Sequence, residues 1–182
     1  MAKNRLETRD GDRIAVVAGL RTPFAKQATA YHGVPALDLG KMVVAEMLQR
    51  AELDPKEIDD VIVGCANPEG EQGLQVGRLI SARALGTSVP GMTVNRYCAS
   101  GLETISIATA KIKAGMGHCY LAGGTESMSL IPMTGYKLSP SYKATMENIN
   151  YHVSMGATAE AVASKYDITR EQADEFAYNS HV

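Results

Sequence analysis

The feature that most constrains the fold is a regular alternation of short apolar runs with longer amphipathic segments. Runs that read as buried strands cover residues 13–19, 61–66, 91–96 and 118–124. The segments between them have room for a helix each, which parallel strands require as crossover connections. An alternation of this kind predicts a mostly parallel sheet covered by helices on both faces. We therefore expect an α/β fold for residues 1–124.

Three amphipathic segments are expected to form the covering helices, over residues 39–53, 74–86 and 100–115. Asp38 stands directly before the first of them, and its side chain can accept a hydrogen bond from a free N–H of the first turn. We expect Asp38 to be the N-cap. The third helix is apolar on more than one face, which is typical of a buried helix.

After the fourth predicted strand the character of the sequence changes. The next stretch is irregular and rich in methionine and proline, and two amphipathic segments follow it, residues 158–167 and 169–182. Thr169, with acidic and amide residues just after it, indicates a helix start. A long irregular stretch usually serves a function outside the compact sheet. We therefore divide the chain into residues 1–124 and 125–182.

Composition excludes several classes of protein. A net charge of −2, no tryptophan and two phenylalanines argue against nucleic-acid binding. No apolar run approaches the roughly 18 residues that span a bilayer, and the first residues lack the apolar core of a secretory signal. We expect a cytoplasmic protein. The three cysteines and four histidines show no metal-ligand spacing, and the glycines of residues 70–77 follow no nucleotide-binding pattern, so no metal or bound cofactor is expected.

The sequence VNRYCASGLE, residues 94–103, places Cys98 between a predicted strand and a predicted helix. At such a junction, free backbone N–H groups and the helix dipole favour a thiolate. The small residues that follow would let a carbonyl group approach. The alternative is a buried structural thiol, which the local pattern alone favours because free cysteines are often buried. Cys65 and Cys119 are expected to be core residues for the same reason.

The sequence VNRYCASGLETI, followed by AGGTESMS, closely resembles the nucleophile region and the next strand and loop of thiolases, the 3-ketoacyl-CoA/acetyl-CoA acyltransferases. Further stretches resemble the family in the same order: RTPFAKQATAYHG, GCANPEGEQGLQVGR, IPM and MGATAEAVASKYDITREQADEFAYNSH. The resemblance extends over nearly the whole chain. It implies a thiolase-like fold with an inserted loop domain, of which residues 125–182 are the incomplete start.

The resemblance also implies roles for individual residues. Cys98 is expected to be the nucleophile that carries the acyl group as a thioester, and its backbone N–H is expected to lie in the oxyanion hole. Met155 corresponds to a methionine that lines the acyl pocket. The implied reaction cleaves a 3-ketoacyl-CoA with free coenzyme A to acetyl-CoA and a shortened acyl-CoA, or runs in reverse. Coenzyme A is then a co-substrate, and no bound cofactor or metal is expected.

The chain departs from the family in one respect. The Gly-His-Pro segment that carries the activating histidine is absent, as are the Cys-x-Gly and Asn-Glu-Ala-Phe segments. His118 and His152 lie in no such motif, and we expect them to be surface or packing residues. The chain therefore resembles the first half of a thiolase, and we expect it to be part of a longer enzyme.

Several alternatives remain at this point. A biosynthetic acetoacetyl-CoA thiolase shares the same residues, whereas a decarboxylating ketoacyl synthase fits the cysteine motif less well. From another class, the chain could be a non-catalytic oligomerisation or binding module derived from a thiolase, since a fold does not guarantee its chemistry. The resemblance of GCANPEGEQGLQVGR to a subunit-interface segment implies a homodimer or tetramer. A multienzyme partner in fatty acid β-oxidation is a further expectation.

Overall fold

The structure, a computed structural model, describes residues 13–182. The chain divides between Lys137 and Leu138 into two compact units, and each is described by itself. The boundary that we placed after Gly124, where the character of the sequence changes, therefore lies before the division between the two units. That the residues after Gly124 begin an inserted loop domain stays a prediction.

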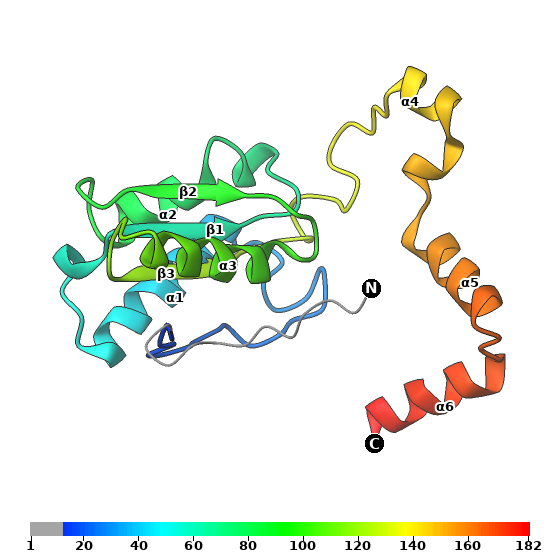
Figure 1. Cartoon of the computed structure of the whole chain (residues 1–182), viewed down its shortest axis with the longest axis horizontal. Helices are drawn as coiled ribbons and strands as arrows, with labels where there is room; N and C mark the ends of the chain where they lie inside the picture. The colour runs from blue at the N-terminus through cyan, green and yellow to red at the C-terminus, as the bar shows by residue number, and fades with distance from the viewer. Residues whose placement is uncertain (1–12) are drawn as a thin grey trace. The chain divides into compact units, whose positions relative to one another are not determined.

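The first unit is built on a parallel sheet whose described strands lie in the order β2–β1–β3 (Figure 1). The strands are β1 (Asp60–Gly64), β2 (Gly91–Val94) and β3 (Tyr120–Gly124). They coincide with three of the four predicted strands. The prediction of an α/β fold with a parallel sheet is confirmed.

The first predicted strand, residues 13–19, does not form. These residues run without regular secondary structure and pair with no strand of the described chain. Val16 and Val17 are 84% and 83% exposed. A strand forms only where a neighbour satisfies its backbone groups, and β3 has no second partner among residues 13–182. The β-branched pattern was present, but the pairing was not.

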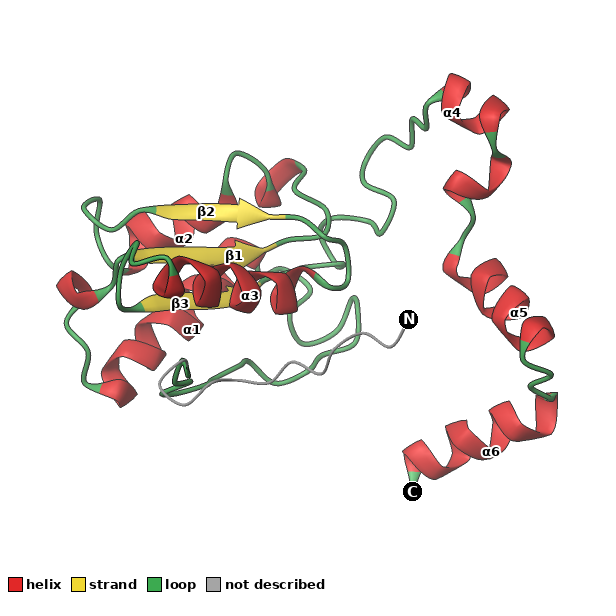
Figure 2. Ribbon diagram, in the orientation of Figure 1, coloured by secondary structure: helices red, strands yellow, loops and turns green. Residues whose placement is uncertain are grey.

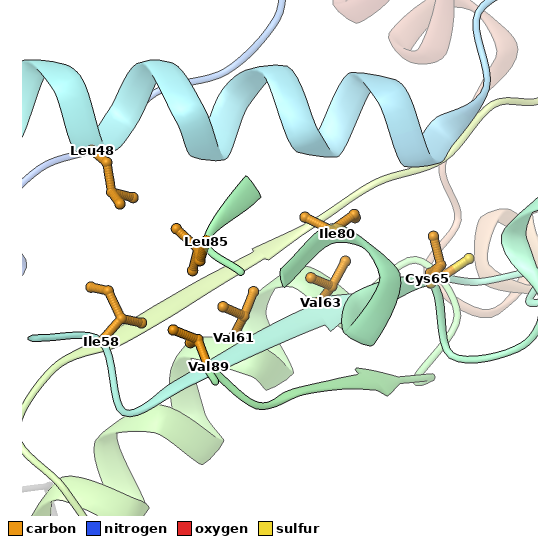
Figure 3. Close-up of a cluster of buried hydrophobic side chains, with 9 residues drawn as sticks. Leu48, Ile58, Val61, Val63, Cys65, Ile80, Leu85 and Val89 are labelled. Atoms are coloured by element: carbon orange, nitrogen blue, oxygen red, sulfur yellow. The ribbon is translucent and has the colours of Figure 1, made fainter. Parts of the chain in front are cut away.

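The central strand β1 is buried along its whole length. Its residue Ile62 lies in register with Met92 of β2 and Ala122 of β3. Because successive side chains point to opposite faces, Val61 and Val63 share one face, and they pack into the main apolar cluster (Figure 3). The cluster consists of Leu48, Ile58, Val61, Val63, Cys65, Val76, Ile80, Leu85 and Val89.

Two helices, α1 (Ala36–Ala51) and α2 (Val76–Ala84), supply the other side of this cluster. Figure 2 shows them on the face of the sheet opposite to α3. The expectation that Asp38 caps α1 is wrong, because the helix begins earlier and its N-cap is Pro35. Asp38 lies in the first turn, where its carboxylate pairs with Arg83 of α2 at 2.6 Å. This ion pair joins the two helices.

Helix α3 (Ser100–Lys113) covers the other face of the sheet. Its buried residues are small: Ser100, Thr104 and Ala108. Two of its larger apolar residues are exposed, Leu102 at 70% and Ile105 at 45%. The expectation of a helix buried nearly all round is therefore wrong for this unit. Small side chains face the sheet because α3 lies very close to Gly64 at the end of β1.

The second unit is helical. It contains α4 (Tyr142–Glu147), the short 3-10 helix η3 (Ile149–His152), α5 (Met155–Lys165) and α6 (Arg170–His181). The predicted helices 158–167 and 169–182 correspond to α5 and α6. The Thr169 start is confirmed, because its side chain and that of Gln172 cap each other's backbone N–H groups at 3.3 and 2.9 Å. None of the helices in residues 13–182 is long and apolar enough to cross a membrane.

Candidate active site at the strand–helix junction

Cys98 lies in a short turn, residues 95–100, that joins β2 to α3 and that we call the junction turn. The Cys98 side chain is exposed. The alternative of a buried structural thiol, which the local pattern favoured, is therefore wrong. A nucleophile needs this access, because the carbonyl that it attacks must reach the sulfur.

The junction turn has an unusual backbone at Tyr97, whose φ angle is 46°. This left-handed conformation costs a residue with a β-carbon about 1–2 kcal/mol. It allows two tight turns in succession, in which Ala99 N–H donates to Arg96 O at 3.1 Å and Ser100 N–H to Tyr97 O at 3.1 Å. Cys98 is thereby placed two residues before the first residue of α3.

Side chains of the junction turn satisfy its own backbone. Ser100 Oγ accepts from Arg96 N–H at 2.8 Å and donates to Tyr97 O at 2.6 Å. Asn95 Oδ1 accepts from Tyr97 N–H at 2.8 Å, and Asn95 Nδ2 donates to Ala66 O at 3.1 Å. The turn is thus bonded both to itself and to the loop that follows β1.

The start of α3 lies unusually close to the sheet. A β-carbon placed on Gly64, the last residue of β1, would lie 2.7 Å from the carbonyl carbon and from the β-carbon of Ser100. Only glycine fits there. This contact holds the first turn of α3, and so the junction turn, against the carboxyl end of β1.

A polar network that the sequence analysis missed lies beside the junction turn. Glu126 Oε2 accepts from Ala66 N–H at 2.7 Å, and Glu126 Oε1 accepts from Gln72 Nε2 at 2.6 Å. Gln72, in the short helix η2 (Gly70–Gln72), is fully buried and accepts from Ser127 N–H at 2.6 Å. One sequence feature could have pointed to this network: Glu126 is an acidic residue just after a predicted parallel strand, where loops of neighbouring strands meet.

The other two cysteines are less accessible than Cys98. Cys65 is buried in the main cluster, as predicted, and Cys119 is half-buried against it. Burial raises the pKa of the Cys65 thiol to about 12, and the Glu126 carboxylate adds to this increase. Burial also raises the pKa of Cys119, with Asp59 adding to it. Both groups are protonated at neutral pH and fit structural roles.

The raised pKa of Cys65 predicts how stability depends on pH. In the unfolded chain this thiol titrates near its ordinary value of 9.0, but in the folded protein near 12. Between these values the folded state keeps a proton that the unfolded state releases, so this contribution is complete below about pH 9 and is lost as pH rises toward 12. We expect a Cys65→Ala variant to show a smaller fall in the urea midpoint between pH 8 and 11 than the wild type. Parallel pH profiles would contradict this.

The other candidate residues lie away from the junction turn or in the second unit. His118 is exposed and precedes β3, at the edge of the parallel sheet opposite to the junction turn. His152 and Met155 are exposed residues of the second unit. Of the surface or packing positions expected for the two histidines, both take the surface position. The acyl-pocket role of Met155 stays a prediction.

The first unit also contains a cavity of about 760 Å³ between residues 20–27, α1 and the β1–β3 side of the sheet. Its lining is mainly apolar, and neither Cys98 nor Asn95 contributes to it. It is therefore separate from the exposed thiol. Among residues 13–182, no group of three or more His, Cys, Asp and Glu side chains is arranged to hold a metal ion.

Comparison with known proteins gives consistent matches. The family described as "Thiolase, N-terminal domain" matches residues 14–182. A 3-ketoacyl-CoA thiolase of Bacillus subtilis (strain 168) is 46% identical over 168 residues, which is 91% of this chain and 43% of the relative. Another, of Aeromonas salmonicida (strain A449), is 37% identical over 97% of this chain and 47% of the relative.

A solved structure is similar in fold as well. The Bacillus anthracis acetyl-CoA acetyltransferase matches with a TM-score of 0.74 and 30% identity, over 91% of this chain and 45% of that protein. The chain thus spans about half the length of the curated relatives and of the solved structure that it matches.

Proposed function

This chain belongs to the thiolase family, and from that premise we propose that it is the part of a 3-ketoacyl-CoA thiolase that carries the acyl-accepting cysteine. The observation that supports the proposal most directly is the exposed Cys98 thiol, two residues before the N-terminus of α3. The substrates are proposed to be 3-ketoacyl-CoA and coenzyme A, with coenzyme A as a co-substrate and no bound cofactor.

In the proposed reaction, the Cys98 thiolate attacks the 3-keto carbon of the substrate. A sulfur–carbon bond forms and the bond between C2 and C3 breaks. The electron pair of that bond goes to C2, which takes up a proton and leaves as acetyl-CoA. The thiolate of free coenzyme A then attacks the acyl thioester and releases Cys98. The same steps in reverse condense two acyl-CoA molecules.

Two properties of the junction turn support this role. The positive end of the helix dipole at the start of α3 stabilises negative charge, both on a thiolate and on the oxyanion formed during attack. We propose the backbone N–H of Cys98 as one oxyanion donor. The exposure of Cys98 gives an acyl-CoA thioester a path to the sulfur.

The groups that move protons are proposed to come from elsewhere in the enzyme. His118 lies at the other edge of the sheet from Cys98 and is not a candidate base. Because the chain spans 43% to 47% of the relatives, we propose that the activating histidine and the second cysteine belong to the part of the relatives' length that this chain does not span.

The function is tested by incubating the chain with acetyl-CoA and measuring the mass of the Cys98 peptide. We expect an acetyl group, 42 Da in mass from its composition, on Cys98 of the wild type, and none at this position in a Cys98→Ser variant, because a serine hydroxyl is a far weaker nucleophile than a thiolate. A Cys119→Ser variant is the matched control and should acetylate like the wild type. We expect no turnover of acetoacetyl-CoA by the 182-residue chain.

A non-catalytic thiolase-derived module is the second candidate function. The exposed apolar residues Leu102 and Ile105 of α3 favour it, because a surface of this kind suits contact with another protein. Folded protein that forms no acetyl adduct on Cys98 would support this candidate instead. The biosynthetic direction, acetoacetyl-CoA synthesis, uses the same cysteine. It is distinguished from the degradative direction by comparing acetyl-CoA with 3-ketoacyl-CoA as substrates.

The assembly and location are proposals as well. We propose a homodimer or tetramer, supported by the position of β2 at a free edge of the described sheet, where a second copy could add strands. We also propose that the enzyme is cytoplasmic and acts in fatty acid β-oxidation, because the proposed reaction shortens an acyl-CoA. A multienzyme partner in that process is proposed as well. Light scattering of the protein at micromolar concentration tests the assembly.

A further inference from the structure

We propose that Asn95 is a positioning residue for Cys98: its side chain holds the junction turn in the conformation that presents the sulfur for acyl transfer. This inference rests on the proposed function of Cys98 as the acyl acceptor. Asn95 itself is not proposed to contact the substrate. It acts through the backbone of Tyr97, the residue directly before the nucleophile.

The backbone of Tyr97 needs support to keep its conformation. Its φ of 46° lies in the left-handed region, which residues with a β-carbon rarely adopt. The Tyr97 side chain is 75% exposed, so its packing adds little to hold the backbone in place. If Tyr97 relaxed to an ordinary φ, the chain direction at Cys98 would change, because the two residues are covalently joined.

Asn95 provides this support with both ends of its amide. The oxygen accepts from Tyr97 N–H at 2.8 Å, and the nitrogen donates to Ala66 O at 3.1 Å. These bonds join the residue before the nucleophile to the loop after β1, which lies 29 residues away in the sequence. A contact of this range stabilises the tertiary position of the turn as well as its local shape.

The loop that receives Asn95 is itself held firmly. Ala66 N–H donates to Glu126 Oε2 at 2.7 Å, and Glu126 Oε1 accepts from the fully buried Gln72 at 2.6 Å. Hydrogen bonds to a carboxylate are stronger than those between neutral groups. Asn95 is therefore bonded to a loop that is anchored to a buried side chain, whereas the turn that it supports is exposed.

Ser100 completes the arrangement on the other side of Tyr97. Its Oγ donates to Tyr97 O at 2.6 Å, while its backbone packs against Gly64. The N–H of Tyr97 is thus bonded to Asn95, and its C=O to Ser100. Asn95 is the more specific position for a test, because Ser100 also packs at the start of α3 and its replacement would disturb more than the turn.

The test measures the rate constant of acetyl adduct formation on Cys98 over a range of acetyl-CoA concentrations. We expect Asn95→Ala to lower the rate constant at saturation by about 10- to 100-fold, since small displacements of a reacting group have effects of this size. The half-saturating concentration should change by about twofold or less, because Asn95 is not in the proposed binding surface. A general loss of structure would not separate the two quantities in this way.

A second variant and a control make the result specific. Asn95→Ala combined with Tyr97→Asn should regain a part of the lost rate, because asparagine adopts the left-handed conformation more readily than tyrosine. Arg96→Ala removes only the exposed ion pair with Glu103 from the same turn and should change the rate by about twofold or less. Thermal unfolding of each variant shows whether it is folded.

The outcomes separate this inference from the proposed function. A folded Asn95→Ala variant that acetylates at the wild-type rate overturns the positioning role and leaves the function of Cys98 intact. If Asn95→Ala is unfolded, the double variant Asn95→Ala/Tyr97→Asn is measured instead. A folded double variant whose rate of adduct formation shows no gain over a protein without the Cys98 thiol also overturns the inference. A wild-type chain that forms no adduct on Cys98 contradicts the function itself, and the positioning role is then overturned with it.

Discussion

Replacing Gly77 by alanine is expected to remove most of the stability of the first unit, whereas the same change at Gly101 should leave stability unchanged or slightly higher. Gly77 is the second residue of α2, and a β-carbon there would overlap Met92 O and lie 2.6 Å from Met92 C. Backbone atoms of β2 cannot move aside as the end of a side chain can. We expect a loss of about 3 kcal/mol or more.

Gly101 is a closely matched control for Gly77. It is the second residue of α3, so the change to alanine has a similar effect on helix propensity in both helices. Apart from its chain neighbours and the backbone of its own helix, no atom lies within 4 Å of the position that a β-carbon on Gly101 would take, so the added methyl group has space. The difference between the two variants therefore measures the close contact of α2 with β2.

The measurement is urea-induced unfolding followed by circular dichroism. Wild type and Gly101→Ala should unfold at similar urea concentrations, and Gly77→Ala should unfold at a much lower concentration or lack a folded baseline. Equal midpoints for Gly77→Ala and the wild type would show that α2 does not approach β2 as closely as the structure describes.

Gln72→Leu is expected to have the second-largest effect, a destabilisation of about 3 kcal/mol. Leucine has nearly the volume of glutamine, so the change removes hydrogen bonds without leaving a large cavity. The Ser127 N–H loses its acceptor, and Glu126 loses the donor at 2.6 Å. Both losses occur where Gln72 is fully buried, so water cannot replace the missing partners.

The control for this prediction is Gln49→Leu, at an exposed position of α1. A surface change of this kind should alter the free energy of unfolding by about 0.5 kcal/mol or less. Urea unfolding of both variants at pH 7 gives the comparison. A Gln72→Leu variant as stable as Gln49→Leu would mean that the network around Glu126 contributes no net stability.

Local sequence signals predicted those parts of the structure that depend on near neighbours. Three of four strands and the order of strands and helices followed from apolar runs and their spacing. Thr169 caps α6 as expected, and Gly115, the last residue of the predicted segment 100–115, follows α3 with a φ of 72°. Such features involve residues a few positions apart, so their physical cause is present in the sequence itself.

The same signals failed where a distant partner decides. Residues 13–19 have the composition of a strand, but no strand of the described chain pairs with them. The apolar residues of α3 suggested burial, whereas the close approach to Gly64 turns the small residues inward and leaves Leu102 exposed. Periodicity describes one segment and carries no information about what lies against it.

For the candidate site, the sequence by itself determined that Cys98 lies at a strand–helix junction and resembles the acyl-accepting cysteine of thiolases. Only the tertiary structure decided that the thiol is exposed, that Tyr97 is left-handed, and that Asn95 bonds to Ala66 beside Glu126. The physical reason is that parallel strands bring their carboxyl ends together at one edge of the sheet. Loops far apart in the sequence meet there, and their hydrogen bonds set the geometry of the turn.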